Sequence, residues 1–574
     1  MAGSVDLARN SMYLKEANLP IKNISGKVFF SESEVHFKDI SAQSFGGELK
    51  ANMQTTIPFS KKDSQIVLKL EGKANSQALQ QWAQFPLPDL SGSSSWLAKV
   101  TLNNSSINTL GLSLDFKNSK VYLPDVIDKP KGKNFDVGVD LNWDDSQFNV
   151  EILSSGLIKG YLEQKKKGWS GGIAIKQAPF NFDEDKLLIN AQLDSIHLAD
   201  WEKWYSNYAT TKPENSSQQI ELNIKANSLK LEDSEFKQFE LVSTNNQSGW
   251  DNKISSNKLE GKIFIPDNKA QAVEINLSKL VLDADETTAP KKTKKTKKTN
   301  TTTEHDYLSR EAKIRIKSMI FNDKDIGEAR LNMYPKNIGA VISDISVNGK
   351  GFKLVGSGIW NKSKKLTRLN LSLNAEKLVN IMRTFSYEGK IYRAKTKAKI
   401  KINWQGDPAS FELVKLGGKV NINIEKGVLA DIDSSSGKVF SFLGLQNFTS
   451  RLLSFNFSDL KEDGLIFDSI KGDFTINKGI IDTRNTKIAG DSVNVDFRGK
   501  SNLMTKTMDF RVEVNPRLSD TFPLVGGLYA GPVGVVVGFF ISSFNKETDN
   551  RIDKNISQDY DLIGTWDKPI VKKL

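Results

Sequence analysis

The chain contains no cysteine, and its three histidines, His36, His197 and His305, lie far apart in the sequence. The absence of cysteine excludes disulfides and thiolate metal or redox sites, and the isolated histidines lack the short spacing of a metal-binding set. The sequence also has neither a Gly-x-Ser-x-Gly nucleophile motif nor a His-Glu-x-x-His motif. We therefore expect a protein that is not an enzyme and that uses neither a metal nor a cofactor.

Long apolar segments are absent before residue 521. The N-terminus also lacks the basic region followed by an apolar core that marks an export signal. The printed sequence therefore shows neither an export signal nor an N-terminal membrane anchor. If the protein acts outside the cytoplasm, we expect such a segment upstream of this sequence.

Charge is not concentrated as it would be in a nucleic-acid-binding protein. The formal net charge is +12, but six lysines lie in the low-complexity run 291–298, and the remaining +6 is spread along the chain. We therefore expect no nucleic-acid partner. The lysine run itself predicts a disordered, solvated loop, and contact with anionic lipid headgroups is the alternative.

Alternation of apolar and polar residues is abundant, as in Leu369-Asn370-Leu371-Ser372-Leu373. A period of two is typical of strands with one buried face and one wet face. Turn signals such as Gly46-Gly47, Gly171-Gly172 and Lys478-Gly479 separate these segments. The pattern predicts a mainly β fold with mostly antiparallel sheet.

Three short helices with aromatic residues are predicted near residues 76–82, 198–204 and 376–385, each following a strand. Their similar setting indicates a degenerate internal repeat of strand-rich units, and three unrelated connecting helices are the alternative. Apolar residues at helical spacing predict a further amphipathic helix within residues 435–455.

Residues 521–545 contain no charge in a chain that is 26% charged. As one helix the segment would be about 37 Å long, which exceeds the roughly 30 Å hydrocarbon core of a bilayer. Four glycines would share one helical face and permit close helix packing, although Pro532 argues against one straight helix in water. We expect a kinked or paired apolar helix that contacts a membrane or fills an apolar cavity, and a buried core helix is the alternative. These helix-packing glycines are Gly527, Gly531, Gly534 and Gly538.

Strands with one apolar face must cover that face. Two sheets could pack face to face as a sandwich, or a single curled sheet could hold lipid chains as a trough. Periodicity alone does not choose between these two arrangements.

Short motifs spread along the chain are similar to those of one protein family. They are Phe45-Gly46-Gly47-Glu48-Leu49, Leu123-Pro124 with Lys129-Pro130, Leu198-Ala199-Asp200-Trp201, Gly418-Lys419-Val420, Phe442-Leu443-Gly444-Leu445, Pro523-Leu524-Val525-Gly526-Gly527 and Gly564-Thr565-Trp566-Asp567-Lys568-Pro569. With them the chain resembles the AsmA-like envelope proteins of Gram-negative bacteria and, within these, the YhdP type. The likeness is loose up to residue 400 and closer after it, and Leu452 and Asn456 depart from the family pattern.

The resemblance implies a bridge-like lipid transport protein. Such a protein forms a long, curved, open β trough with a hydrophobic groove, and it passes phospholipid between the inner and outer membranes. It implies a periplasmic location, an inner-membrane anchor that is absent from this chain, and envelope proteins as further partners. A non-transporting periplasmic β-sandwich that scaffolds or regulates outer-membrane assembly is the alternative. A cytoplasmic basic binding protein is favoured only if the natural gene begins at Met1.

These expectations assign residues and boundaries. The apolar members of the alternating segments are candidates for groove lining: Val35, Phe37, Ile220, Leu222, Ile224, Ile275, Leu277, Ile314, Ile316, Leu369, Leu371, Ile400, Ile402, Ile422, Ile424, Val493, Val495, Phe510 and Val512. Candidates for membrane contact or for capping the groove are Leu524, Val525, Leu528, Phe539, Phe540 and Ile541. The expected segments are a β trough (1–282), a disordered lysine- and threonine-rich loop (283–306), a continued trough (307–434), an amphipathic helical segment (435–455), a terminal β segment (456–520), the apolar glycine-rich helices (521–545) and a C-terminal segment with the last strand (546–574).

Overall fold

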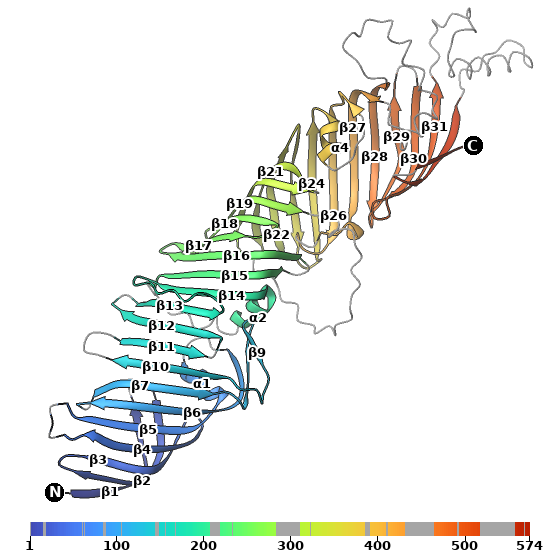
Figure 1. The fold of residues 1–574 in the computed structure, drawn as a ribbon. Coiled ribbons are helices and arrows are strands. Elements are labelled where there is room, and N and C mark those ends of the chain that lie inside the picture. Colours follow the sequence, from blue (N-terminus) through green and yellow to red (C-terminus); the bar gives the residue numbers. More distant parts are fainter. Residues whose placement is uncertain are drawn as a thin grey trace, which may run out of the picture. The chain divides into compact units, whose positions relative to one another are not determined.

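The computed structural model of the chain describes two compact units, Met1–Asn268 and Lys269–Leu574 (Figure 1). The described residues are 2–574 without 15–18, 60, 62, 84–87, 105, 144–147, 155, 167, 207–217, 232–233, 283–309, 322, 385–390, 409–410, 431–463, 491–492, 517–556 and 567–568. The predicted lysine-rich loop, the amphipathic helix of 435–455 and the apolar segment of 521–545 lie outside the described residues.

Where the structure describes it, the first unit consists of strands with two short helices. Its elements are β1 (Ala2–Leu14), β2 (Leu19–Ser31), β3 (Val35–Ser44), β4 (Gly47–Ile57), β5 (Gln65–Asn75), α1 (Ser76–Ala83), β6 (Asp89–Asn103), β7 (Ser106–Asp115), β8 (Ser119–Leu123), β9 (Ile127–Lys129), β10 (Asp136–Trp143), β11 (Phe148–Ser154), β12 (Ile158–Lys165), β13 (Gly168–Lys176), β14 (Leu187–His197), α2 (Leu198–Ser206), β15 (Ile220–Leu231), β16 (Ser234–Asn246), β17 (Gly249–Ser255) and β18 (Leu259–Pro266).

The second unit has the same character. Its elements are β19 (Val273–Leu282), β20 (Ala312–Phe321), β21 (Lys324–Lys336), β22 (Gly339–Gly349), β23 (Phe352–Asn361), β24 (Leu366–Ala375), α4 (Leu378–Thr384), β25 (Ile391–Tyr392), β26 (Thr396–Gln405), the 3-10 turn η2 (Leu413–Lys415), β27 (Gly417–Ala430), β28 (Gly464–Asn477), β29 (Ile480–Ala489), β30 (Val493–Asn502), β31 (Thr507–Pro516), β32 (Gln558–Thr565) and β33 (Pro569–Lys573).

Strands pair almost entirely in chain order. In the first unit the main sheet runs from β1 to β7, continues with β10, and ends at β18, while β8 and β9 extend the start of β6 as a small second sheet. In the second unit the sheet runs from β19 to β24 and from β26 to β33, with β25 beside the end of β27. Among the described strand pairs within each unit, pairing is antiparallel except at β13–β14, β14–β15 and β19–β20. The prediction of a mainly β, mostly antiparallel fold with few short helices is confirmed, and α1, α2 and α4 lie where helices were predicted.

Local sequence explains both the tight turns and the bends. Lys478 and Gly479 both have positive φ, at 50° and 75°, as a two-residue turn of the kind favoured between antiparallel strands requires. Asp39 and Asp344 also have positive φ, and each lies where the pairing register shifts by a bulge. Bulges bend a strand and increase its twist, so these positions curve the sheets locally.

One predicted turn is wrong. Gly171 and Gly172 lie inside β13, not between strands. A side chain at Gly172 would collide with the backbone of Asn181, which belongs to the connection from β13 to β14. Glycine is therefore needed here for close approach of a second chain segment and not for a turn.

That connection crosses the polar face of the sheet. Asn190 of β14 is buried and donates from Nδ2 to the carbonyl oxygen of Pro179 at 3.0 Å, and the Phe182 ring lies 5.7 Å from that of Tyr161. Tyr161 alternates with Gly160 and Leu162, which carry the apolar side of β12. The crossover between these parallel strands thus does not cover the apolar side of the sheet.

Candidate functional site

The apolar sides of neighbouring strands are in register and form rows that cross each sheet. In the first unit one such row joins eight strands from β6 to β15: Ala98, Leu112, Val139, Ile152, Gly160, Ile173, Ile189 and Leu222. In the second unit one row joins nine strands from β19 to β28: Leu277, Ile316, Ala329, Val347, Leu354, Leu373, Ala398, Ile422 and Gly472. We call the side that carries these rows the apolar face and the opposite side the polar face.

The predicted lining residues occupy alternate positions within their strands, and most are half-buried. Four are buried by the protein itself: Ile316, Ile424, Val495 and Val512, at 9%, 8%, 1% and 6% exposed. The last three belong to a cluster that also contains Phe467 and Ala394, with Leu378 of α4 packed against it. The apolar face of the second unit is thus closed by protein around this cluster, while most of the other predicted lining residues are half-buried. The side chain of Val493 is not described.

The first unit buries its apolar face in two places. In one of them Val126, from the turn between β8 and β9, packs with Ala191 and Phe239. The other lies on the first strands. Leu49, Leu70 and Trp96 are at most 3% exposed, and Leu79 of α1 packs with them. Gly72, between Leu49 and Trp96 in the register, leaves room for the indole ring. The cluster shows that α1 covers the first strands, as a helix on an otherwise uncovered sheet should.

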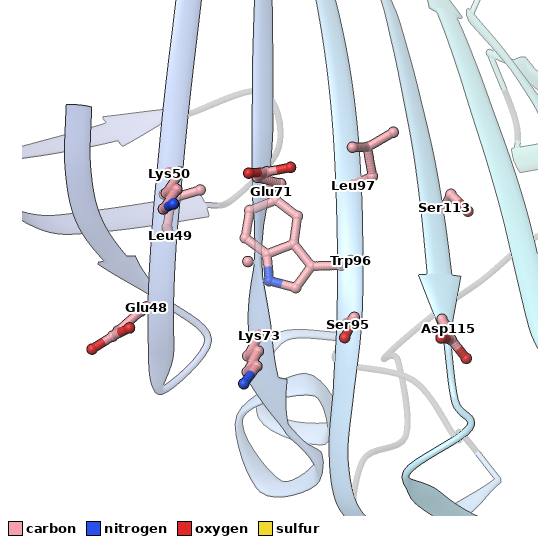
Figure 2. A pocket seen from close by; sticks show the side chains of 11 residues that line it. Glu48, Leu49, Lys50, Glu71, Lys73, Ser95, Trp96, Leu97, Ser113 and Asp115 are labelled. Carbon is pink, nitrogen blue, oxygen red and sulfur yellow. The ribbon is translucent and has the colours of Figure 1, made fainter. Parts of the chain in front are cut away.

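Two shallow concavities lie on the polar face and are unsuited to an apolar ligand. The one in Figure 2 has a volume of about 450 Å³, and its walls are two rows of side chains, Lys50, Glu71, Leu97 and Ser113 in one row and Glu48, Lys73, Ser95 and Asp115 in the other. The other has a volume of about 440 Å³ and is lined by Arg315, Lys317, Glu328 and Arg330 among others. Both hold charged groups of either sign, so they are hydrated furrows between rows of surface side chains.

His197, which the sequence places far from other histidines, has a carboxylate partner. Asp125 Oδ1 lies 2.6 Å from His197 Nδ1, and Asp125 Oδ2 accepts from the His197 backbone N–H at 2.7 Å and from Trp201 Nε1 at 2.9 Å. The Asp125 side chain is only 7% exposed. The cluster ties the turn between β8 and β9 to α2. Burial, and then the carboxylates of Asp200 and Asp125, raise the pKa of nearby Tyr122.

Lys129 is a buried lysine whose role is also structural. Its ammonium donates to the carbonyl oxygens of Phe116, Lys133 and Pro130 at 2.7, 2.9 and 3.2 Å. Burial lowers the pKa of Lys129, and the carboxylate of Asp115 acts against that shift. Three carbonyl partners satisfy the three ammonium protons, so the Lys129-Pro130 motif closes the loop that follows β7.

Among the described residues, no helix combines the length and the apolar character that crossing a bilayer requires. Nor do three or more His, Asp or Glu side chains gather in this part of the chain in a way that could hold a metal ion.

Comparison with known proteins identifies the family. The sequence model of the family described as "YhdP protein" matches residues 1–571. The chain belongs to this family. It is also similar to the "Intermembrane phospholipid transporter YhdP" of Escherichia coli (strain K12), with 21% identity over 604 residues, which cover 100% of this chain and 46% of that relative. This YhdP-family chain therefore spans about half the length of the curated relative that it matches, and no solved structure matches it. The resemblance predicted from short motifs is confirmed at the level of the family.

Proposed function

We propose that this YhdP-family chain conducts phospholipid between the inner and outer membranes of a Gram-negative envelope, in the periplasm, with the acyl chains on its apolar face. The observation that carries the proposal is the row of apolar residues in register across nine strands, from Leu277 to Gly472. The printed name of the E. coli relative, an intermembrane phospholipid transporter, supports it.

The apolar rows supply what a lipid conduit needs. Each methylene of an acyl chain gains about 0.8 kcal/mol when it leaves water for an apolar surface. Nine strands at a spacing of ~4.8 Å extend for about 40 Å, which is longer than one acyl chain. Because neighbouring strands present similar aliphatic groups, a chain that slides along the rows exchanges one apolar contact for another. No covalent step is required, so the function needs no catalytic residue.

The apolar segment of 521–545 would meet the receiving membrane or cap the conduit, with Leu524, Val525, Leu528, Phe539, Phe540 and Ile541 in contact and with Gly527, Gly531, Gly534 and Gly538 packing helices. We further propose that the full-length protein is anchored in the inner membrane. A non-transporting scaffold is the second candidate. The burial of Val495 and Val512 under protein favours it, because a fully covered face would leave no room for lipid.

Site-specific photocrosslinking distinguishes these functions. A photoreactive residue at Leu222 or Ile422, on the apolar face, should crosslink to phospholipid that co-purifies with the protein. Val242 and Ile359, which are 41% and 44% exposed on the polar face, are matched aliphatic controls and should not. Equal labelling from both faces, or no lipid at either, would overturn the conduit and favour the scaffold.

A further inference from the structure

One edge of the second unit is a continuous series of turns. Because β21 to β33 lie side by side and alternate in direction, every second connection falls on the same edge (Figure 1). Backbone hydrogen bonds link neighbouring turns along this edge, from Lys362 N to Ile338 O at 2.8 Å, from Gly406 N to Lys365 O at 2.7 Å, and from Trp566 N to Lys506 O at 2.8 Å. The turns therefore form one ordered rim.

This rim is rich in lysine. Its described residues include seven exposed lysines, one at the end of β21 and six in the turns: Lys336, Lys362, Lys364, Lys365, Lys415, Lys478 and Lys506. The carboxylates in the same turns are Asp407 and Glu412, which leaves a formal net charge of +5, and Glu412 already pairs with Lys415 at 2.6 Å. Successive turns are two strands apart, or about 10 Å. We call this row the lysine rim.

Aromatic residues form the first apolar rung inside the lysine rim. Trp360, Thr367 and Trp404 are register partners on the apolar face. Trp404 is 4% exposed and donates from Nε1 to the carbonyl oxygen of Asp407 at 2.9 Å. The Nε1 atom of Trp360 is buried and has no hydrogen-bond partner among the described residues. The next rungs inward are aliphatic, with Leu369 beside Ile402.

The order from the edge inward is therefore lysine, tryptophan and then aliphatic side chains. The same order is found where proteins meet a lipid interface, because cations contact phosphate, indoles bridge the polar and apolar layers, and aliphatic groups contact acyl chains. Here the layers occur where β23, β24 and β26 meet this edge of a sheet whose apolar face, by the function proposed above, carries the acyl chains. The phosphates of those lipids would then lie along the lysines.

We propose that the lysine rim selects phospholipids with a net negative headgroup, such as phosphatidylglycerol, over zwitterionic ones. The inference rests on the proposed function, since it concerns which lipid the apolar face carries. An ammonium binds phosphate as a point charge without fixed geometry. A zwitterionic headgroup brings its own cation to the same place, and that cation opposes binding to a row of lysines.

The test is competitive loading from vesicles of dioleoylphosphatidylglycerol and dioleoylphosphatidylethanolamine in equal amounts, followed by mass spectrometry of the lipid bound to the purified protein. A lysine close to an anionic lipid group favours it by about fivefold, so the unmodified protein should enrich the anionic lipid at least that much. The variant K362Q/K364Q/K365Q should bring the ratio close to one while total lipid stays the same. High salt should weaken the preference of the unmodified protein.

The control removes the same charge from another place. Lys399, Lys401 and Lys419 are exposed on the polar face of β26 and β27, and the variant K399Q/K401Q/K419Q should keep the preference. Absence of both lipids from the unmodified protein would refute the proposed function itself. Lipid bound without preference, a preference that survives K362Q/K364Q/K365Q, or an equal loss in the control would overturn the selective rim and leave the conduit standing.

Discussion

A carboxylate placed on the apolar face should obstruct lipid movement without unfolding the sheet. Ile422 of β27 lies between Ala398 and Gly472 in the register and is half-buried. Replacement by aspartate removes part of an isoleucine's burial, which costs about 1–2 kcal/mol, and the carboxylate remains in contact with water. The variant I422D should therefore fold and show only a modestly lower melting temperature.

The effect on lipid passage should be much larger. An acyl chain that slides across Ile422→Asp must displace water from the carboxylate, and the effective cost of desolvating an unpaired ion is several kcal/mol. Because each 1.36 kcal/mol slows a step tenfold, a barrier of about 3 kcal/mol lowers the transfer rate more than 100-fold. The rate is measured as transfer of a fluorescent phospholipid from donor to acceptor vesicles by the protein.

The adjacent residue provides a matched control. Asn423 points to the polar face, where its register partners are Lys397 and Lys471. The variant N423D adds the same charge one position away but places it between two cations, so folding and transfer should both be unchanged. If I422D folds and transfers lipid at the rate of N423D, the apolar face does not carry acyl chains and the reasoning fails.

Three further variants test the packing of the first unit. G72A should destabilise it by about 1–3 kcal/mol, because a methyl group there would lie 2.7 Å from the Glu48 carbonyl oxygen and 3.1 Å from the Trp96 ring, and thermal unfolding measures the loss. D125A should cost about 3 kcal/mol, since it removes a buried acceptor of three hydrogen bonds, and faster amide exchange in α2 would report it. The Lys186 ammonium, 2.6 Å away, lowers the pKa of Glu221, so the pair stabilises the fold fully above the usual carboxylate pKa of about 4.3 and loses that contribution as pH falls below it. E221Q should therefore show a shallower loss of stability in acid than the unmodified protein.

The strands were predictable because an alternating sequence satisfies only one geometry. Leu369, Leu371 and Leu373 must share a face in any strand, and they lie opposite Ile402, Ile400 and Ala398. The direction of each strand could not be predicted from this alternation. The pairs β13–β14 and β14–β15 are parallel, yet their residues alternate like those of antiparallel strands, since periodicity reports which face is buried and not which way the chain runs.

The sequence predicted which residues of the candidate site are apolar, but it did not predict which of them other parts of the protein bury. The sequence identifies Val495 as apolar and inward, but its burial depends on Phe467 and α4, which come from elsewhere in the chain. The lysine rim was not predicted from the sequence, for a related reason. Each turn carries only one to three lysines, which is ordinary for a surface turn, and only strand order places them along one edge. Separate counts of charge over odd and even turns would have revealed the asymmetry.

An open apolar face persists only if the rest of the chain stays off it. Every parallel pair requires a connection that crosses the sheet on one side or the other. Between β13 and β14 that connection lies on the polar side. There the missing side chain of Gly172 leaves room for the backbone of Asn181, and Asn190 donates a hydrogen bond to the carbonyl oxygen of Pro179. A crossing on the apolar side would bury Ile173 and Ile189 and interrupt the row to Leu222. The glycine and the buried asparagine thus act on the polar face but preserve the continuity of the apolar one. In this way two residues that would not contact lipid support the lipid transfer proposed above.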